Sequence, residues 1–465
     1  MALGSKLSRL IERAPLRRRN GGFHAALGDR RRYERQIDRL HQRHLFDGGL
    51  HRLTDGEVNL ATVVMHRGHV ARLLARTVAE GEYRLRAAKV RTIVVEGRER
   101  TVFDYPLLDL IVHGVVAEIL TEAIEPLLSP SVYSYRHGIS SMDGVSAFAR
   151  YVRAHRRSRP DPRSRGLYVL RRDVDSYTDS IPLGASSAIW SQVGVAMSSP
   201  GQPPPTPADR ELVSEVIRPT VLTDDGHPAS RLHGVATGQP ISCVCFNVYL
   251  SDLDRAVGEF RGGFYARYSD DLVFAHAEAS VAREVSQALD AGIAELGLRF
   301  NDEKRRDFYL NGAGRDADEW PDARGTTSVA FVGMRVTMDG TVALGQRKAR
   351  GLLRDARRRA TNTASALSEA SVEERGRAVA GVLNALLDRD DAQVQGAAVP
   401  LLTHAITDRR QLDELDNELA LVVASAATGT SGPAAFRKAP YRAVRQEWGL
   451  RSLRRARDRN QGRRG

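Results

Sequence analysis

Cysteines and long apolar runs are scarce in this sequence, and their scarcity excludes several classes of protein. The 465 residues include two cysteines, Cys243 and Cys245, separated by one residue. This count and spacing exclude a disulfide framework and a zinc site built from cysteine pairs, so we interpret both as small buried side chains. No stretch approaches about 18 uninterrupted apolar residues, which argues against a membrane span. Residues 1–20 are basic but lack the apolar core of a signal peptide, so we expect a cytoplasmic protein.

Acidic residues are outnumbered by basic ones, and lysine is rare among the latter. The chain has 69 Lys and Arg residues against 57 Asp and Glu, a formal net charge of +12 and a pI near 10.0. This excess indicates a polyanionic partner, most simply nucleic acid. Five basic residues are lysine and the rest arginine, so GC-rich coding is an alternative source of the charge. Charge therefore indicates a class of partner but not a reaction.

Hydrophobic patterning divides the chain into four consecutive segments. Residues 1–88 are predicted to be a basic helical segment, because apolar residues recur there at helical spacing. Residues 89–345 alternate short β-rich runs with helices, which indicates an α+β domain. Residues 346–424 are predicted to be almost wholly helical. Residues 425–465 are predicted to be a linker and a basic C-terminal segment. The apolar residues with helical spacing near the N-terminus are Leu7, Leu10, Ile11, Ile37, Leu40 and Leu45.

Two stretches rich in proline, glycine or small residues are predicted to lack regular structure. SSPGQPPPTPAD (198–209) is predicted to be a surface loop, because proline removes backbone donors from helices and inner strands. SAATGTSGP (425–433) is predicted to be a flexible linker. After it, Phe436, Tyr441 and Trp448 lie among arginines. This pattern suits stacking on bases and contact with phosphates, and it equally suits a packed terminal helix.

The most informative local feature is RYSDDLVFA (267–275). Apolar and aromatic residues flank Ser269-Asp270-Asp271 at strand-like density, which predicts a β-hairpin with two adjacent carboxylates at its turn. Adjacent carboxylates repel each other, so such a turn is costly unless it is solvated or binds a cation. The pair is not specific by itself, because Asp224-Asp225 and Asp390-Asp391 also occur. A solvated turn is the ordinary interpretation of any one Asp-Asp pair.

A second group of carboxylates favours the cation-binding interpretation. GLYVLRRDVDSYTDSI (166–181) is predicted to be an apolar strand that ends at Asp173, with Asp175 and Asp179 close behind. If this strand lies beside the 264–275 hairpin, Asp173 and Asp270 can share hard cations. Two Mg²⁺ ions held by two or three carboxylates are what in-line nucleotidyl transfer requires.

At this point the sequence resembles the reverse transcriptases, in particular bacterial enzymes related to those of group II introns. Six segments in family order carry the resemblance, over about 260 residues. The segments are the fingers-like region 89–140, DVDSYTDSI beginning at Asp173, HGVATGQPISCVCFNVYLSDLD (233–254), RYSDD (267–271), LGLRFNDEK (296–304) and FVGMRV (331–336). The resemblance implies a right-hand polymerase fold of fingers, palm and thumb, in which the palm is an antiparallel sheet backed by helices.

The resemblance also implies a role for each matching residue. Asp173 and Asp270 would be the principal ligands of two Mg²⁺ ions, with Asp271 in support. Lys304 would donate a proton to pyrophosphate. The implied partners are an RNA template, a DNA product and dNTPs. Residues implied at the nucleotide are Lys89, Arg91, Tyr177, Thr178, Gly238 and Gln239, and those implied in the primer grip are Phe331 and Gly333. A surface charge for either lysine, and a core strand for Phe331, are the alternatives.

Two positions depart from the family pattern. The family usually has an aromatic residue where this chain has Thr178, and that residue blocks the ribose 2′-hydroxyl. We therefore expect weaker discrimination between dNTPs and rNTPs, unless the neighbouring Tyr177 or the backbone supplies the gate. Thr237 replaces the usual Gln before Gly238, which casts doubt on ordinary processive copying and indicates a specialised enzyme.

Two kinds of module found in mobile relatives are missing from the pattern. The sequence has no Cys/His pattern of a zinc-bearing endonuclease and no RNase H-like run of carboxylates, so we do not expect self-mobility. In this the chain resembles domesticated bacterial reverse transcriptases, including abortive-infection and other phage-defence groups, where a dedicated non-coding RNA is a further candidate partner. Two alternatives stay open. One is template-independent or protein-primed DNA synthesis at the same site, and the other is a non-catalytic, maturase-like RNA-binding protein.

Overall fold

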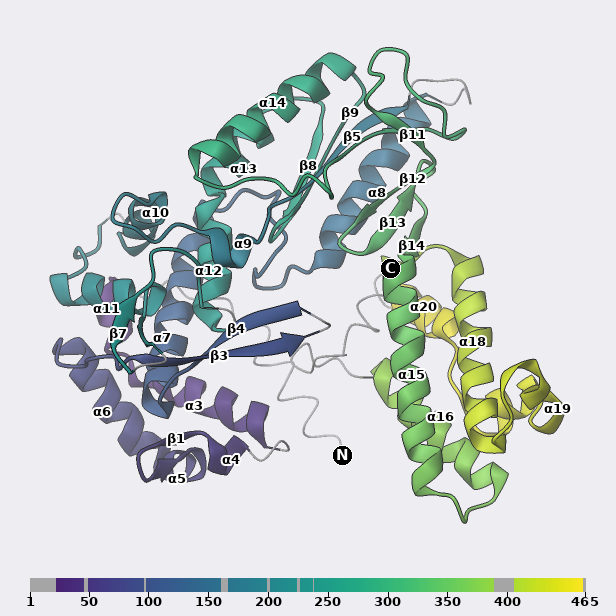
Figure 1. The fold of residues 1–465 in the computed structure, drawn as a ribbon, viewed down its shortest axis with the longest axis horizontal. Coiled ribbons are helices and arrows are strands. Elements are labelled where there is room, and N and C mark those ends of the chain that lie inside the picture. The colour runs from purple at the N-terminus through teal and green to yellow at the C-terminus, as the bar shows by residue number, and fades with distance from the viewer. Residues whose placement is uncertain are drawn as a thin grey trace. The chain divides into compact units, whose positions relative to one another are not determined.

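The computed structural model describes residues 22–45, 49–95, 98–159, 166–198, 201–223, 226–236, 238–388 and 405–462. Their elements are shown in Figure 1. The chain forms two compact units, one from Met1–Leu128 with Thr178–Tyr249 and the other from Ser129–Tyr177 with Leu250–Gly465. Each unit is therefore discontinuous in sequence, whereas the sequence patterns divided the chain into consecutive segments. The assignment of those segments to fingers, palm and thumb stays a prediction.

The first unit combines helices with a four-stranded sheet of order β4-β3-β6-β7 and a small β1–β2 pair. Its central helix α7 buries residues on every side, which explains why LLDLIVHGVVAEIL is apolar all round rather than amphipathic. The helices are α2 (Phe23–Leu27), α3 (Arg30–His44), α4 (Gly49–Arg52), α5 (Leu60–Met65), α6 (Arg67–Ala79), α7 (Leu107–Ile124), η1 (Glu125–Leu127), α9 (Tyr177–Ser180, whose first residue ends the first segment of the second unit), α10 (Ala188–Met197), α11 (Pro207–Ile217) and α12 (Pro240–Tyr249). The strands are β1 (Thr54–Asp55), β2 (Val58–Asn59), β3 (Ala88–Val95), β4 (Arg98–Asp104), β6 (Thr220–Leu222) and β7 (Pro228–Ser230).

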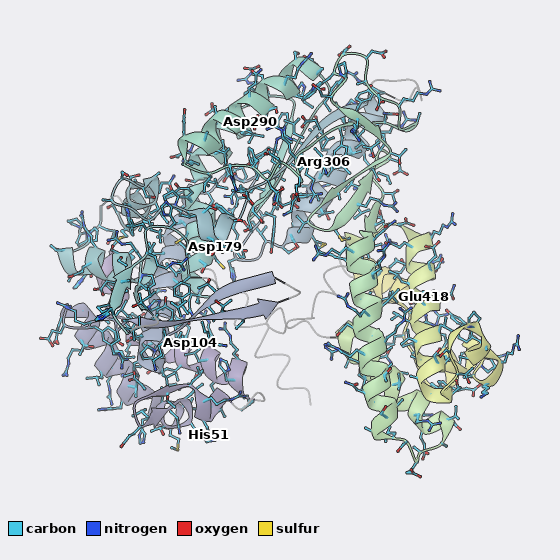
Figure 2. All side chains as sticks on the ribbon, in the orientation of Figure 1. His51, Asp104, Asp179, Asp290, Arg306 and Glu418 are labelled. Carbon is cyan, nitrogen blue, oxygen red and sulfur yellow. The ribbon has the colours of Figure 1, made fainter. Side chains whose placement is uncertain are left out.

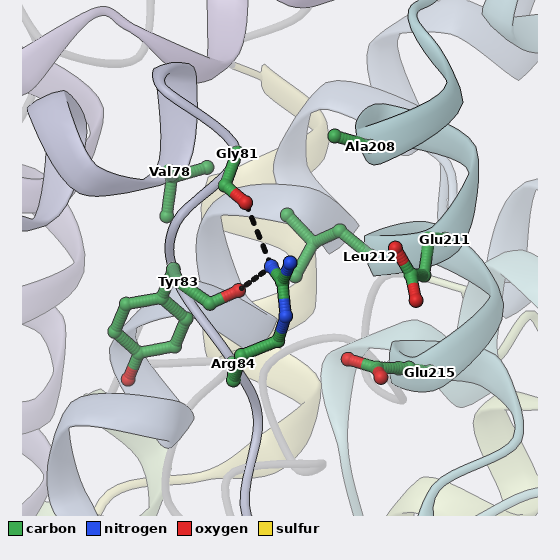
Figure 3. Close-up of a pocket in the computed structure, with 8 residues that line it drawn as sticks. All are labelled: Val78, Gly81, Tyr83, Arg84, Ala208, Glu211, Leu212 and Glu215. Carbon is green, nitrogen blue, oxygen red and sulfur yellow. Dashed lines mark hydrogen bonds between the residues drawn. The ribbon is translucent and has the colours of Figure 1, made fainter.

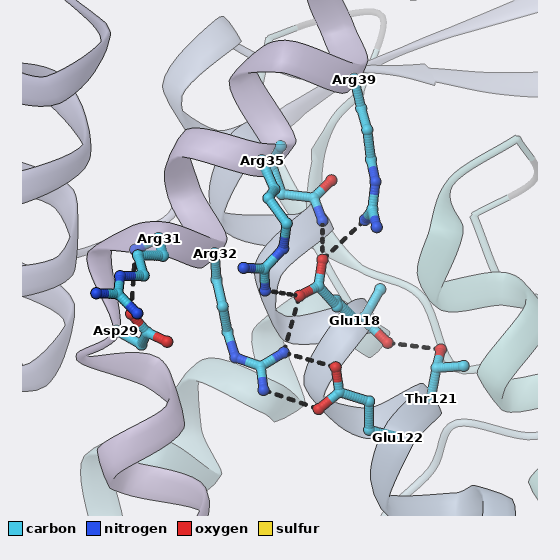
Figure 4. Close-up of polar contacts among 10 residues, drawn as sticks. Asp29, Arg31, Arg32, Arg35, Arg39, Glu118, Thr121 and Glu122 are labelled. Carbon is cyan, nitrogen blue, oxygen red and sulfur yellow. Dashed lines mark hydrogen bonds and ion pairs between the residues drawn. The ribbon is translucent and has the colours of Figure 1, made fainter. Parts of the chain in front are cut away.

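Several arginines of α3 form ion pairs with acidic residues of α7 in the same unit (Figure 4). Glu118 on α7 accepts hydrogen bonds from Arg32 and Arg39, both at 2.8 Å, and from Arg35. Arg32 also forms a two-bond ion pair with Glu122. Part of the positive charge that suggested a nucleic-acid partner is therefore taken up by ion pairs between α3 and α7. Of the predicted helical positions, Ile37 is buried and Leu45 is 44% exposed, whereas Leu7, Leu10 and Ile11 lie outside the described residues.

A small cavity lies between the loop after α6 and helix α11 (Figure 3). Arg84 closes one side by donating to the carbonyl oxygens of Gly81 and Tyr83. The volume of the cavity, about 10 Å³, is close to the minimum for one water molecule, so the cavity is too small for a substrate.

The second unit is built on a five-stranded sheet of order β11-β10-β5-β9-β8, antiparallel except for the β10–β11 pair. Its strands are β5 (Leu167–Asp173), β8 (Phe264–Tyr268), β9 (Asp271–His276), β10 (Arg306–Leu310) and β11 (Arg324–Thr326), and a second sheet has β12 (Ser328–Phe331), β13 (Met334–Thr337) and β14 (Val342–Leu344). Alternate residues of β5 face different helices. Val169 belongs to the core cluster that includes Phe148 of α8 (Ser141–Ser158), whereas Arg172 donates to Ser286 of α14 (Ala279–Glu295). Both faces of the sheet are covered, so β5 reads as a nearly continuous apolar run.

The C-terminal part of the second unit is helical. Its elements are α15 (Gln346–Ala366), α16 (Val372–Asp388), α18 (Arg409–Thr428), η2 (Gly432–Ala434), α19 (Ala435–Lys438), η3 (Ala443–Glu447) and α20 (Leu453–Gly462), and α13 (Ser251–Gly258) completes the helices of the unit. Helices α15, α16 and α18 pack on one another. Figure 2 labels Glu418 on α18, which forms an ion pair with Arg357 on α15 at 3.3 Å. The predicted helical character of 346–424 is confirmed for its described residues.

Several expectations from the sequence are confirmed and two are wrong in part. The α+β class and the β-rich runs of residues 89–345 are confirmed. Of the two cysteines predicted to be buried, Cys245 is buried and Cys243 is only partly so. The flexible linker at 425–433 is wrong in its first half, because α18 continues to Thr428 and buries Ala427. The loop at 198–209 ends early, because Thr206 caps α11 and Pro207 occupies its first position, where a missing N–H costs nothing.

The position of Trp448 agrees with the second interpretation of the C-terminal aromatic residues, in which they pack inside the protein. Trp448 is 8% exposed and lies against Gly376 of α16, where a Cβ atom would come within 2.3 Å of its ring. Tyr441 is exposed and has Arg445 over its ring. Among the described residues no single helix is long and apolar enough to cross a membrane. The bent pair Arg409–Thr428 and Gly432–Lys438 passes that test together, by length and composition only.

The contacts of Glu118 generate a stability prediction. Burial raises the pKa of Glu118, but Arg35, Arg39 and Arg32 outweigh burial and hold the pKa below its usual 4.5. The stabilisation is therefore present above pH 4.5 and is lost as the pH falls through the lowered pKa. We expect Glu118→Gln to reduce stability by about 2 kcal/mol at pH 7, and by less in acid. Urea unfolding at several pH values measures this. Glu80→Gln, at an exposed i,i+4 pair, is the control, and an equal effect of both variants would contradict the prediction.

Candidate active site

The hairpin predicted at 264–275 is confirmed, and its turn carries the first carboxylate. Strands β8 and β9 pair from Phe264 with Ala275 to Tyr268 with Asp271, which leaves Ser269 and Asp270 as a two-residue turn. Ser269 has a φ of 57°, a region that residues other than glycine rarely adopt. Such a residue is retained only where its surroundings fix it, and this occurs often at functional sites. The turn is therefore an unusual local structure that the rest of the unit must hold.

The strand ending at Asp173 lies directly beside this hairpin. β5 pairs antiparallel with β9, and Asp173 is the cross-strand partner of Asp271. The backbone N–H of Val174 donates to the carbonyl oxygen of Asp270 at 3.0 Å, so the pairing continues into the turn. Opposite residues on neighbouring strands point to the same face, and like charges in such a pair are destabilising. The structure thus brings together the three acidic residues predicted from sequence.

Lys304 also reaches this group. The chain after α14 is held against the end of β5, because Asn301 N–H donates to the Asp173 carbonyl and Asp175 N–H donates to the Arg299 carbonyl. From there Lys304 Nζ lies 2.6 Å from Asp173 Oδ1. The ammonium group of Lys304 therefore offsets part of the negative charge of this group of carboxylates.

Asp271 is oriented by two donors. The backbone N–H of Val332 donates to Asp271 Oδ2 at 3.1 Å, and Arg171 Nε lies 3.4 Å from Oδ1. Val332 and Gly333 form the turn between β12 and β13, which is the predicted primer-grip hairpin. Phe331 has no exposed surface and belongs to the core of the second unit, so its ring follows the core-strand alternative.

The acidic group is costly in the absence of a cation. Burial, together with the nearby charges of Asp173 and Asp271, raises the pKa of Asp270 to about 6. Burial also raises the pKa of Asp271, although Arg171 and the Val332 N–H oppose this. Desolvated, mutually repelling carboxylates with oxygen donors are the set that Mg²⁺ prefers. The residues therefore fit the divalent ions that the sequence implied.

The carboxylates do not, however, converge as a finished ligand set. In the part of the chain that the structure describes, no three His, Cys, Asp or Glu side chains are arranged to hold a metal ion. The reason lies in the partners just described, because Asp173 is turned to Lys304 and Asp271 to Arg171 and Val332. The cross-strand pairing of Asp173 with Asp271 is fixed by the backbone and does not depend on how the two side chains are turned. Binding would require Asp173 to exchange Lys304 for the ion.

A buried ion pair that sequence reasoning missed supports the turn. Arg267 and Asp254 are both fully buried and joined by several hydrogen bonds, the shortest at 2.6 Å. Arg267 also donates to the carbonyl oxygen of Ser269 at 3.1 Å, and Tyr265 donates to Asp254. An arginine inside an apolar strand was the available signal, since such a charge is buried only when it is paired.

The remaining predicted residues lie elsewhere. Tyr177 is in the second unit and is 4% exposed, close enough to influence Arg267 and Tyr265 electrostatically. The others belong to the first unit, and their placement relative to the carboxylates stays a prediction. They are Lys89, exposed and opposite Asp104; Arg91, ion-paired with Asp104 at 2.6 Å; Thr178 on α9; Gly238, with a φ of 86° and open space around it; and Gln239. Figure 2 labels Asp104. Thr237 lies outside the described residues.

Comparison with known protein families gives a match over the part of the chain that carries these carboxylates. The stretch 111–336, just under half of the chain, matches the family described as reverse transcriptase (RNA-dependent DNA polymerase). It includes Asp173, Asp270, Asp271 and Lys304. The comparison with curated proteins found no match.

Solved structures that match the chain include telomerases from two Candida species. One is apo telomerase from Candida tropicalis truncated from its C-terminal domain, with 13% identity and a TM-score of 0.41, covering 56% of this chain and 55% of that chain. Another is telomerase from Candida albicans with a TWJ fragment of telomeric RNA, with 11% identity and a TM-score of 0.44, covering 82% and 67%. The chain therefore spans about half the length of the first of these.

The raised pKa of Asp270 gives a prediction for the metal-free protein. Because the folded-state pKa of about 6 exceeds the ordinary 3.8, ionisation above pH 6 costs stability, and the cost fades as the pH falls toward 3.8. We expect Asp270→Asn to raise stability in EDTA at pH 7.5, by at most about 3 kcal/mol, and by much less near pH 4. Thermal unfolding measures this, with Asp252→Asn at an exposed site on α13 as control. A variant less stable than wild type at pH 7.5 would disprove the prediction.

Proposed function

We propose that this chain is an RNA-directed DNA polymerase that works by two-metal nucleotidyl transfer. The observation that carries the proposal is the cross-strand pairing of Asp173 with Asp271, with Asp270 in the adjoining turn. A pair of strands that places three acidic groups together at one end gains nothing for stability and supplies oxygen donors for cations. The reverse transcriptase match over the same residues supports the reaction class.

Each residue of the site has a proposed task. Asp173 and Asp270 hold two Mg²⁺ ions, with Asp271 in support; when bound, the ions lower the pKa of a primer 3′-hydroxyl and neutralise triphosphate charge. Lys304 moves from Asp173 to the leaving pyrophosphate and donates a proton there. Arg267 and Asp254 keep the Ser269 carbonyl, and with it the turn, in place. The five-stranded sheet would be the palm and α15, α16 and α18 the thumb.

Helix α15 supports a nucleic-acid partner. Arg347, Arg350 and Arg354 recur at i, i+3 and i+7 and are exposed, so they share one face of the helix. In the part of the chain that the structure describes, Arg350 and Arg354 make no ion pair, unlike Arg357 and the buried arginines of the sheet. We propose that this face follows the backbone of an RNA–DNA duplex. An RNA template, a DNA product and dNTPs are the proposed partners.

The biological setting is a further part of the proposal. The resemblance to group II intron-like and phage-defence enzymes supports a domesticated bacterial enzyme of antiphage defence that acts in the cytoplasm, with a dedicated non-coding RNA as a candidate partner. Thr178 and Thr237 keep template-independent or protein-primed synthesis as the second candidate. Incubation with single dNTPs, with and without RNA, separates the two, since product that needs no template and migrates with protein favours the second.

A polymerase assay tests the proposed reaction. We expect Asp270→Asn and Asp271→Asn each to lower incorporation of dNTPs on a primed RNA template by at least about 100-fold, because each removes an oxygen donor from the metal site. Asp252→Asn, an exposed acid paired with Arg255, should leave the rate unchanged. Equal activity in wild type and site variants, or none in either, would favour the non-catalytic RNA-binding alternative.

Salt-dependent binding tests the role of α15. We expect Arg350→Gln and Arg354→Gln each to weaken RNA–DNA duplex binding at every sequence and to reduce the slope of log K against log[salt] by about 1. Arg410→Gln on α18, which is 89% exposed and paired with Glu414, is the matched control. A slope that falls as much in the Arg410 variant would show that general charge, not this face, sets the affinity.

A further inference from the structure

A lysine at the start of the first thumb helix is linked to a catalytic carboxylate through one residue of the β12–β13 turn. Lys348 on α15 is one of the five lysines of the chain. Its Nζ donates to the carbonyl oxygen of Val332 at 2.7 Å. The N–H of the same residue, Val332, donates to Asp271 Oδ2 at 3.1 Å. One residue therefore contacts the helix with its C=O and the carboxylate with its N–H.

The turn that makes both contacts has a demanding backbone. Val332 has a φ of 49° and Gly333 a φ of 70°. For a β-branched residue such as valine this conformation is unfavourable, so contacts from outside must hold it. Those contacts come from α15 and the residue before it, since Gly345 N–H also donates to the Gly333 carbonyl at 3.0 Å.

Gly333 is required by the approach of the lysine. A Cβ atom on Gly333 would lie 2.4 Å from Cε and 3.0 Å from Nζ of Lys348. Any larger residue would push the lysine away from the Val332 carbonyl. The predicted primer-grip glycine thus has a use within the protein itself, because it makes room for the side chain that holds the turn.

The geometry points to Lys348 as a positioning residue, which couples the place of α15 to the orientation of Asp271 through the Val332 peptide groups. This inference rests on the proposed function, because it assigns regulation of the same site. A shift of α15 when a duplex binds along its arginine face would move Lys348, and with it the Val332 N–H that fixes Asp271. Duplex binding at the thumb would therefore adjust the metal-binding carboxylates directly.

The contacts separate Lys348 from the arginines that are proposed to meet nucleic acid. Arg347, Arg350 and Arg354 are exposed, whereas Lys348 is partly buried and its ammonium group is directed at a backbone carbonyl. A direct contact of Lys348 with a phosphate would require that hydrogen bond to break. If Lys348 positions Asp271, its substitution should weaken metal binding. If Lys348 instead contacts a phosphate, its substitution should weaken duplex binding.

The test measures binding of Mn²⁺ alone, by electron paramagnetic resonance on the full chain without nucleic acid. We expect Lys348→Met to weaken Mn²⁺ binding by about 10-fold or more, as removal of groups that orient metal ligands does. Gly333→Ala should give a similar loss although the lysine is retained. The matched controls are Lys438→Met, an exposed lysine on α19, and Gly351→Ala, a glycine of α15 with open space around it. Both controls should bind Mn²⁺ as wild type does.

Kinetics and duplex binding complete the test. In dNTP incorporation, Lys348→Met should lower kcat by about 10-fold with little change in KM for dNTP, and the duplex Kd should stay within about twofold. Unchanged Mn²⁺ binding in both Lys348→Met and Gly333→Ala would overturn the inference, as would a loss confined to duplex affinity. If wild type binds Mn²⁺ in an Asp270-dependent way but makes no DNA, the polymerase proposal fails while the coupling to Lys348 is still supported by the Mn²⁺ data.

Discussion

The repulsion between Asp173 and Asp271 across two neighbouring strands is the constraint on which the second unit depends. Like charges opposite each other cost free energy, so the remainder of the unit must supply enough stability to hold them. Helices cover both faces of the sheet, and basic side chains lie beside the acidic ones. Lys304 on Asp173 and Arg171 on Asp271 each neutralise part of the charge, while Asp270 keeps a pKa near 6.

The elements of this site could be predicted from sequence because their signals are local. An apolar run that stops at Asp173 and an aromatic hairpin interrupted by Ser269-Asp270 give strand ends and a turn without any knowledge of partners. Their adjacency came from the family resemblance, and the β5–β9 register agrees with it. The same local rules failed at 425–428. The four residues SAAT are weakly apolar and are followed by Gly429. They nevertheless belong to α18, because Ala427 packs against its neighbours.

Contacts between distant residues were beyond sequence reasoning. Arg267 and Asp254 lie thirteen residues apart on a strand and a helix, and neither position has a pattern that names the other. Lys348 reads as one cation in a basic helix, and only the β12–β13 turn reveals that its ammonium group is directed at Val332. From the sequence alone, Trp448 could equally stack on bases or pack inside the protein. The residue against which it packs, Gly376, lies 72 residues earlier. Pairings of this kind depend on tertiary register, which no local propensity encodes.

The arginines of this chain show why net charge is a poor measure of nucleic-acid affinity. Arg172 and Arg267 are fully buried, and Arg32 nearly so, and each is ion-paired with a carboxylate of its own unit. An arginine in such a pair contributes to the count of +12 but releases no counterions from a nucleic acid. The charge proposed to meet nucleic acid is a smaller set on α15, where Arg350 and Arg354 are exposed and make no ion pair with any residue that the structure describes. Lys348 lies on the same helix and contacts Val332, whose N–H donates to Asp271. The helix proposed to bind nucleic acid is therefore joined to one of the proposed metal ligands at its first turn.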